Sequence, residues 1–287
     1  MKREYLKKRN PRREYNMPRE PSQTKRSDLS QTQPEDVDGL ARPWNALLAS
    51  FQFLTVFPPI IRRAFTPQEL GAAVGWFPLV GAVLGLILAV GDGLLALVFP
   101  PPVRSALVLV LWILLTAALH LDGFLDACDG LLGGGTAAKR LEIMRDERIG
   151  AFALVGGVML LLLKFSGMLS LPQRWAVLVL APTLSRWGMS LAIVAFPYGR
   201  KEGLGAIMKR HAGWLELGLA TLITLPIAWF VATWTGIALF GVTAVAAGLG
   251  AFFTLRLIPG LTGDIYGALN ETIEVIVLLS FVLLRGP

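Results

Sequence analysis

The 287-residue sequence contains one cysteine and two histidines. The single Cys128 excludes an intrachain disulfide, and nothing points to an oxidising compartment. His120 and His211 are too few to build a metal site from two or three histidines. No HExxH motif, CxxC pair or Ser/His/Asp set is visible. These absences leave carboxylates, arginines and lysines as the side chains that can carry chemistry.

Charge is also scarce, and it is unevenly spread. Charged residues make up 16% of the chain, whereas hydrophobic residues make up 54%. Residues 1–43 hold eleven Lys or Arg against seven Asp or Glu and have few large apolar side chains, which predicts a disordered, basic cytoplasmic tail. Basic runs attract lipid or RNA phosphates. A solvated extension is the simpler interpretation, and we expect membrane lipid but no nucleic acid as a partner.

The body, residues 44–287, consists mainly of long apolar runs. A helix needs roughly 20 mostly apolar residues to cross a bilayer, and it satisfies its own backbone hydrogen bonds there. We therefore predict an all-α, polytopic integral membrane helical bundle that forms a transmembrane catalytic domain. About seven transmembrane helices are expected, at 72–98, 105–121, 149–171, 175–196, 214–233, 236–254 and 265–284. Residues 44–57 are too short to span and are ended by Pro58-Pro59, which predicts an interfacial or re-entrant N-terminal helix.

The distribution of Lys and Arg predicts the orientation, because cytoplasmic loops are enriched in both. One side would receive the tail, Arg62, Arg63, Lys139, Arg140, Arg145, Arg148, Arg200, Lys201, Lys209, Arg210 and Arg256. The other side would receive only Arg104, Arg174 and Arg285. The first side is therefore expected to be cytoplasmic, in a bacterial or archaeal cytoplasmic membrane. An odd number of spans would place the C-terminus outside.

The stretch HLDGFLDACDG, residues 120–130, brings three carboxylates to the end of an apolar run. Asp122, Asp126 and Asp129 are spaced by four and three residues, so they share one face if the helix over 105–121 continues through them. Such crowded charges indicate a divalent cation, and oxygen ligands suit Mg²⁺ or Mn²⁺. A solvated helix end is the alternative. His120 points to the other side of this helix and is expected to be structural, and Cys128 is expected to be a small packing residue.

A second acidic stretch, GLTGDIYGALNETIEV, spans residues 260–275. Asp264, Asn270, Glu271 and Glu274 fall on one broad helix face. The helix dipole favours acids at a helix N-terminus, which would explain Asp264 but not the acids two to three turns further on. We expect Asp264 and Glu271 to be further metal ligands and Asn270 to contact substrate.

Cations on the same predicted side could bind phosphate oxygens. Arg145 and Arg148 flank the metal candidate Asp146 in EIMRDERIGAF, and Arg200 and Lys201 lie in PYGRKEGLGA. Two more cations lie inside predicted spans, where an unpaired charge is costly. Arg186 could pair with an acid or contact phosphate, and Lys164 could snorkel to the outer interface or bind substrate. Gly133–Gly135 could approach a phosphate or could simply break the chain.

Several of these stretches together resemble the adenosylcobinamide-GDP ribazoletransferase family, also called cobalamin synthase. The matching stretches are ASFQFLTVFP, GWFPLVGAVLG, ALHLDGFLDACDGLLGG, RLEIMRDERIGAF, LAPTLSRW, PYGRKEGLG and GLTGDIYGALNETIEV, in the family's order. Glu147 departs from the pattern, where a smaller residue such as Ser is expected. The tail before residue 44 lies outside the resemblance.

The resemblance implies a late step of cobalamin biosynthesis. Adenosylcobinamide-GDP and α-ribazole, or its 5′-phosphate, would give adenosylcobalamin, or its 5′-phosphate, and GMP. Other enzymes of the same pathway and a second copy of the chain are further candidate partners.

The same resemblance suggests a role for each site residue. Asp122 and Asp126 would hold Mg²⁺ on the diphosphate, and Asp129 would be a third ligand or the base. Arg148 and Arg186 would offset charge on the leaving GMP. Asp264, Asn270 and Glu271 would complete the site, around a second metal ion if there is one.

Three other functions fit part of the pattern. A CDP-alcohol phosphotransferase uses a similar acidic motif, but with Ala-Arg where Phe124-Leu125 follow Gly123. An Asp-rich membrane prenyltransferase would ionise an allylic diphosphate. A transporter would need polar groups near the bilayer midplane and repeated halves, and neither is obvious in the sequence.

Overall fold

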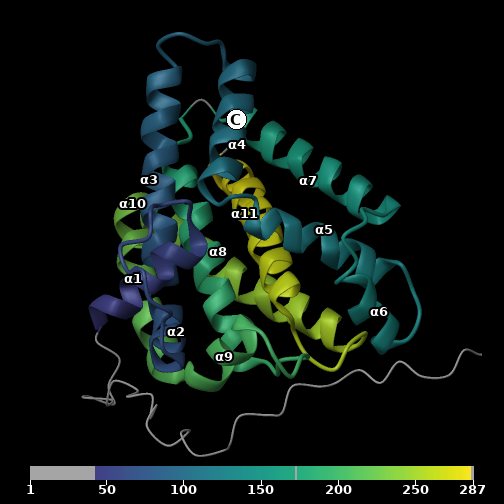
Figure 1. Ribbon diagram of the computed structural model, residues 1–287. Helices are drawn as coiled ribbons and strands as arrows, with labels where there is room; N and C mark the ends of the chain where they lie inside the picture. The colour runs from purple at the N-terminus through teal and green to yellow at the C-terminus, as the bar shows by residue number, and fades with distance from the viewer. Residues whose placement is uncertain (1–42, 172, 286–287) are drawn as a thin grey trace, which may run out of the picture. The chain divides into compact units, whose positions relative to one another are not determined.

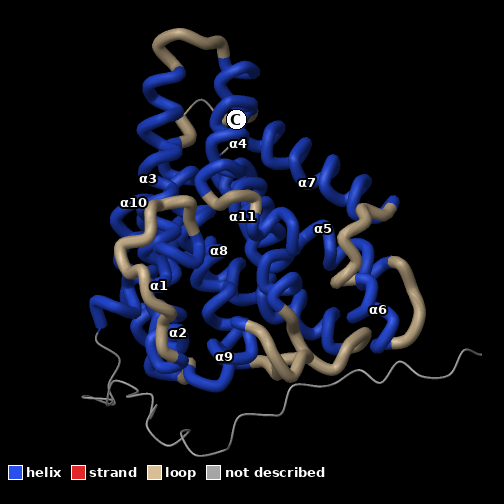
Figure 2. Tube along the Cα trace, in the orientation of Figure 1, coloured by secondary structure: helices blue, strands red, loops and turns tan. Residues whose placement is uncertain are grey.

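The computed structural model describes residues 43–171 and 173–285, and within them the chain is helical (Figures 1 and 2). The prediction of a disordered tail falls outside these residues. The elements are α1 (Pro43–Leu54), α2 (Pro67–Ala73), η1 (Val74–Trp76), α3 (Phe77–Leu95), α4 (Pro101–Leu115), α5 (Leu119–Leu132), α6 (Ala137–Ile143), α7 (Ala151–Leu169), α8 (Trp175–Ala195), α9 (Leu204–His211), α10 (Trp214–Leu255) and α11 (Gly263–Arg285). The all-α prediction is confirmed, and α1 is the short N-terminal helix expected before Pro58.

The described part of the chain has five helices that are long and apolar enough to cross a membrane. They are the continuous run Pro67–Leu95 and helices α7, α8, α10 and α11. A sixth candidate is the pair α4 and α5, which is bent by 90° at a short break. The protein is therefore a polytopic membrane bundle, as the apolar runs predicted.

Helix α10 is a hairpin of two helices, although its 42 residues form one uninterrupted run. Thr233 has a positive φ of 51° and a non-helical ψ of −128°. A Cβ added at Gly236 would collide with the carbonyl oxygen of Ala228, whereas eight residues along a straight helix are about 12 Å apart. Trp229 and Trp234 also pack edge to face across the turn, with ring centroids 5.2 Å apart. The two arms correspond to the predicted spans 214–233 and 236–254.

Helix α8 forms the centre of the bundle. In the most apolar 18-residue stretch of α8, 94% is buried inside the protein. The corresponding stretch of α10 is only 28% buried. Gly81 and Gly85 of α3 lie so close to the backbone of α8, at Pro182 and Leu178, that neither position has room for a Cβ. This close approach excludes lipid between the two helices, so α8 can hold polar groups away from the bilayer.

The chain breaks sharply between α4 and α5, contrary to one expectation. The predicted span 105–121 ends at Leu115, and Ala117 and Ala118 take left-handed φ values of 48° and 56°. The acids at 122–129 therefore lie on a separate helix, set at a right angle to the apolar one. Left-handed conformations are costly for residues with a Cβ, so surrounding contacts must hold this turn in place.

Two of the three cations predicted for the opposite side meet one buried acid at the far end of the bundle. Arg174 is 2% exposed and donates from Nε to Asp92 Oδ1 at 2.7 Å and from Nη1 to Ser105 Oγ at 2.6 Å. Arg104 Nε lies 3.4 Å from the same Asp92 oxygen. Asp92 thus links α3, α4 and the start of α8. Helix α3 continues past Gly91 and Gly93, which flank Asp92, to Leu95.

Candidate active site

A close crossing of α5 and α11 brings the two acidic stretches together. A Cβ on Gly123 would lie 3.0 Å from the carbonyl oxygen of Asp264, and a Cβ on Gly267 would lie 3.0 Å from that of His120. Only glycine at both positions allows the backbones to approach this far without a shift. Residues separated by about 140 positions in the sequence therefore share one pocket.

The pocket is a cavity of about 460 Å³ lined by residues of both stretches. Charged side chains on its lining are Asp122, Arg145, Arg200, Glu202 and Asp264. We call this set the charged rim. Tyr198, Tyr266 and His120 also line the cavity. Acids and arginines that face one hollow are suited to an anionic ligand whose charge is shared between a cation and arginine side chains.

Two carboxylates of this cavity, Asp122 and Asp264, and the neighbouring Asp126 act on one another electrostatically. Asp126 and Asp264 both lie near Asp122, so each charge disfavours the others. Arg200 offsets part of this charge, since its Nη2 donates to Asp264 Oδ2 at 2.7 Å. An arginine already placed beside an acid here indicates that the site needs positive charge.

The carboxylates near the cavity are oxygen donors, the ligand type that Mg²⁺ takes. Among residues 43–171 and 173–285, no three His, Cys, Asp or Glu side chains are arranged as a complete metal cage. Mg²⁺ is commonly held by one or two carboxylates together with substrate phosphates, and it keeps several waters. Asp122, Asp126 and Asp264 are donors of this chemical type, but they do not form a three-residue metal site by themselves, so substrate or water oxygens would have to complete the coordination.

Asp129 has a different local role from its two neighbours on α5. Its carboxylate accepts hydrogen bonds from the backbone N–H groups of Gly150 at 2.6 Å and Ala153 at 2.9 Å. These groups belong to the first turn of α7, whose N-terminal amides would otherwise lack partners. Asp129 therefore fixes the start of α7 against α5.

The arginines and lysine predicted to contact phosphate do not all line the cavity. Arg145 lines the cavity, whereas Arg148 is paired with Asp146 at 2.6 Å and its side chain is 88% exposed. Hydrogen bonding to Arg148 lowers the pKa of Asp146 to about 2. Lys201 is not part of the cavity lining, although its neighbour Arg200 is. Of these predicted residues, Arg145 and Arg200 are the two at the cavity.

A buried ion network lies beside the cavity and contains the remaining predicted residues. Lys164 Nζ donates to Glu271 Oε2 and Glu274 Oε2, each at 2.5 Å. Glu274 also pairs with Arg186 and accepts from Asn270 Nδ2 at 3.2 Å. All five side chains are buried. Two cations and two anions balance one another, as buried charges require.

This network corrects one expectation and decides another. Lys164 does not snorkel to an interface, because it is 3% exposed and bound to two glutamates. Arg186 pairs with Glu274, which was one of its two predicted roles. The sequence could not reveal this pairing, since the partners come from three different helices.

His120 is buried, with 3% of its surface exposed. It lines the cavity, and its Nδ1 lies 3.3 Å from Arg186 Nη2. It was expected to be structural because it lies off the aspartate stripe. Tyr198, Tyr266 and Glu202 were not predicted at all, since no spacing connects them with the acids.

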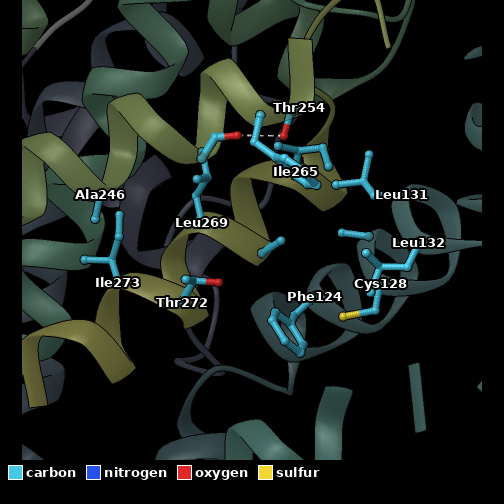
Figure 3. A pocket seen from close by; sticks show the side chains of 14 residues that line it. Phe124, Cys128, Leu131, Leu132, Ala246, Thr254, Ile265, Leu269, Thr272 and Ile273 are labelled. Carbon is cyan, nitrogen blue, oxygen red and sulfur yellow. Dashed lines mark hydrogen bonds between the residues drawn. The ribbon is translucent and has the colours of Figure 1, made fainter. Parts of the chain in front are cut away.

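A second recess, lined almost wholly by apolar side chains, lies on another face of α5 (Figure 3). It has a volume of about 240 Å³ and lies between α5, the second arm of α10 and α11. Phe124, Cys128 and Leu132 line it from α5. The sulfur of Cys128 faces Gly156, which supports the packing role expected for it. The aspartate stripe does not line this recess, so it is not part of the acidic site.

Together, the fold and the site define an integral membrane helical protein with an acid- and arginine-lined cavity at one end of its bundle. The cobalamin-5-phosphate synthase family model matches residues 46–282. The chain belongs to this family, which makes it a transferase of cobalamin biosynthesis. The match excludes the tail and covers nearly the whole described bundle.

Curated relatives named adenosylcobinamide-GDP ribazoletransferase support the assignment. A protein of Geotalea daltonii is 34% identical over 238 residues, covering 83% of this chain and 96% of the relative. A protein of Pseudomonas syringae is 39% identical over 247 residues, covering 84% and 98%. One of Desulfitobacterium hafniense is 38% identical, covering 82% and 95%. No solved structure matches the chain.

Proposed function

We propose that the cavity with the charged rim is the active site of an adenosylcobinamide-GDP ribazoletransferase. A hydroxyl of α-ribazole, or of its 5′-phosphate, attacks the phosphorus that carries cobinamide. The bond from that phosphorus to the bridging oxygen breaks, and GMP leaves. The products are adenosylcobalamin, or its 5′-phosphate, and GMP. The observation that supports this proposal most is the meeting of Asp122, Asp264, Arg145 and Arg200 at one cavity.

Asp122, Asp126 and Asp264 are the proposed ligands of Mg²⁺, or of Mn²⁺. When bound, the ion would neutralise charge on the diphosphate and orient it. Asp122 lines the cavity, and we assign to its carboxylate the proton of the attacking hydroxyl. Asp129, committed to the first turn of α7, acts as a positioning residue in this proposal.

Arg145 and Arg200 are the proposed contacts of the phosphate oxygens. Their guanidinium groups can donate two parallel hydrogen bonds to a phosphate, which offsets the charge that gathers on the leaving GMP. Arg200 would exchange its bond to Asp264 for one to substrate as Asp264 takes up its ligand role. Arg148 and Lys201 are proposed to attract the anionic donor from solvent.

The buried network is proposed to hold the site rather than to touch the phosphates. Arg186, Glu271 and Asn270 are bonded to partners within the bundle, so their first role is to fix α8 and α11 beside α5. Lys164 joins α7 to the same group. Removal of one member would shift the cavity wall without deleting a ligand of the substrate.

We further propose that the cavity faces the cytoplasm. Arg145 and Arg200 lie at the cavity end of the bundle, whereas Arg104 and Arg174 meet Asp92 at the other end. Excess Lys and Arg on one side is the usual mark of the cytoplasmic face. Both substrates are large and polar, so they would reach this face without crossing the bilayer.

A purified-enzyme assay tests the proposal directly. The detergent-solubilised full chain is supplied with adenosylcobinamide-GDP and α-ribazole 5′-phosphate, with Mg²⁺ or with excess EDTA. We expect GMP release and the joined corrinoid only with Mg²⁺ and acceptor together. Release of GMP that needs no acceptor, or an equal rate in EDTA, would contradict the proposal. Comparison with free α-ribazole decides which acceptor is preferred.

A further inference from the structure

The lining of the active-site cavity includes apolar side chains that the roles assigned above do not use. Six side chains form this apolar wall: Phe53, Phe77, Leu119, Met189, Ile193 and Met208. They come from α1, α3, α5, α8 and α9. The wall therefore lies on the same cavity as the charged rim but belongs mainly to helices that carry none of its acids.

The apolar wall is unsuited to phosphates. A phosphate brought against Phe, Met and Ile side chains would lose hydration without gaining hydrogen bonds, which is costly for a charged group. Phe77, Met189, Ile193 and Met208 are each at most 2% exposed, so they are packed in place. Leu119, at 41% exposed, and the half-buried Phe53 supply most of the wall's accessible surface, which gains free energy by burying an apolar, flat group.

The substrates of the proposed reaction differ in how well they offer such a group. Guanine carries a carbonyl, an exocyclic amine and several ring nitrogens, and each would need a partner once buried. The base of a ribazole is a benzimidazole with two methyl groups. In the nucleoside only one of its ring nitrogens is free. The wall thus suits the acceptor base far better than the guanine of the donor.

His120 offers one hydrogen-bond donor to match that nitrogen. Its Nδ1 lies 3.3 Å from Nη2 of Arg186, and a guanidinium can only donate. Nδ1 therefore accepts, and in the neutral ring the proton is on Nε2. Nε2 has no hydrogen-bond partner in residues 43–171 and 173–285, although His120 lines the cavity.

We propose that the apolar wall is the acceptor-base subsite, which holds the methylated benzimidazole of the ribazole, with His120 Nε2 donating to its free ring nitrogen. This inference rests on the proposed function, because it divides that same cavity between the two substrates. The charged rim holds the diphosphate, and the wall places the acceptor hydroxyl toward it. Met189, Ile193 and Met208 then determine which bases fit.

The test compares acceptors of different size with the full-length enzyme. Ile193→Phe fills space in the wall, so it should raise KM for the dimethylated acceptor roughly 10-fold relative to an acceptor without the two methyl groups. Met208→Ala should do the opposite and improve kcat/KM for a base with a third fused ring by about 10-fold relative to the natural one. KM for adenosylcobinamide-GDP should stay within a factor of about two in both variants. This change is smaller than the change that one methylene group causes in a hydrophobic pocket.

Val245→Phe is the matched control, because Val245 is 61% exposed on the outer surface of α10. It should leave the preference among acceptors unchanged. Equal loss for all acceptors, in Ile193→Phe and Met208→Ala alike, would overturn the subsite. A rise in donor KM alone would assign the wall to guanine and would also overturn it. Absence of GMP release by the wild-type chain would instead reject the proposed function.

Discussion

At the scale of single residues, two of the α5 aspartates differ in what they contact. Asp122 lines the cavity, whereas Asp129 accepts two backbone hydrogen bonds from the start of α7. Both lie on the stripe that the spacing predicted. The spacing could not separate the two roles, because the partner of Asp129 is the backbone of another helix.

A substitution pair at Asp129 separates positioning from catalysis. Asn can still accept a capping hydrogen bond, so Asp129→Asn should keep most of the stability and reduce the rate less than about 10-fold. Asp129→Ala removes the cap and should lower the free energy of unfolding by about 1 kcal/mol. Thermal unfolding in detergent and initial rates measure both. Loss of all activity in a stable Asp129→Asn variant would show that this carboxylate is catalytic.

Asp126 is proposed to hold the metal, so its removal should change the dependence of the rate on Mg²⁺. Asp126→Asn should raise the Mg²⁺ concentration for half-maximal rate at least about 10-fold, a typical cost of disturbing a metal site. Glu142→Gln is the matched control, since Glu142 is exposed and pairs with Lys139. An unchanged Mg²⁺ titration for Asp126→Asn would remove this residue from the ligand set.

At the scale of the elements, the crossing of α5 and α11 determines whether the two acidic stretches meet. Gly123→Ala and Gly267→Ala each introduce a Cβ about 3.0 Å from backbone of the other helix. The helices must then shift by a few tenths of an ångström, and the misplaced ligands should lower kcat up to roughly 100-fold.

Gly248→Ala is the control for both variants. A Cβ at Gly248 has no neighbour within 4 Å, so alanine there should be neutral or stabilising because it favours the helix. Rates and thermal stability are measured for all three. If the crossing variants retain full activity, the close approach of α5 and α11 is not needed for the site.

The sequence predicted most of the elements, and the reasons for its errors are physical. Apolar length identified α3, α7, α8, α11 and both arms of α10, because a bilayer demands that length. The break before α5 was missed, since Ala117 and Ala118 carry no turn signal and are held left-handed by their surroundings.

The sequence also predicted only part of the candidate site. The acids and Arg200 were found because charge is rare in such a chain. Tyr198 and the apolar wall were missed, because only the folded bundle brings them to the cavity.

At the scale of the whole molecule, the buried ion network joins three helices inside the bundle. Lys164 of α7 and Arg186 of α8 both pair with Glu274 of α11. Lys164→Met leaves two buried glutamates without their shared cation, which should destabilise the protein by about 3–5 kcal/mol.

The double variant Lys164→Met/Glu271→Gln should recover part of that loss, because Arg186 still balances Glu274 and the second change removes the one negative charge left uncompensated. Lys139→Met, at an exposed pair, should cost less than about 1 kcal/mol. Thermal unfolding in one detergent compares the three. Equal stability of Lys164→Met and the wild type would show that the network does not hold the helices together.

The central claim is that acids from α5 and α11 act together in one cavity on one diphosphate. A double-mutant cycle in GMP release, with Asp122→Asn, Asp264→Asn and the combined variant, tests it most directly. Groups that work as a unit lose their joint effect when either is removed. We predict that the double variant is no slower than the slower single variant. Losses that multiply in the double variant would show that the two acids act independently, and would contradict the claim.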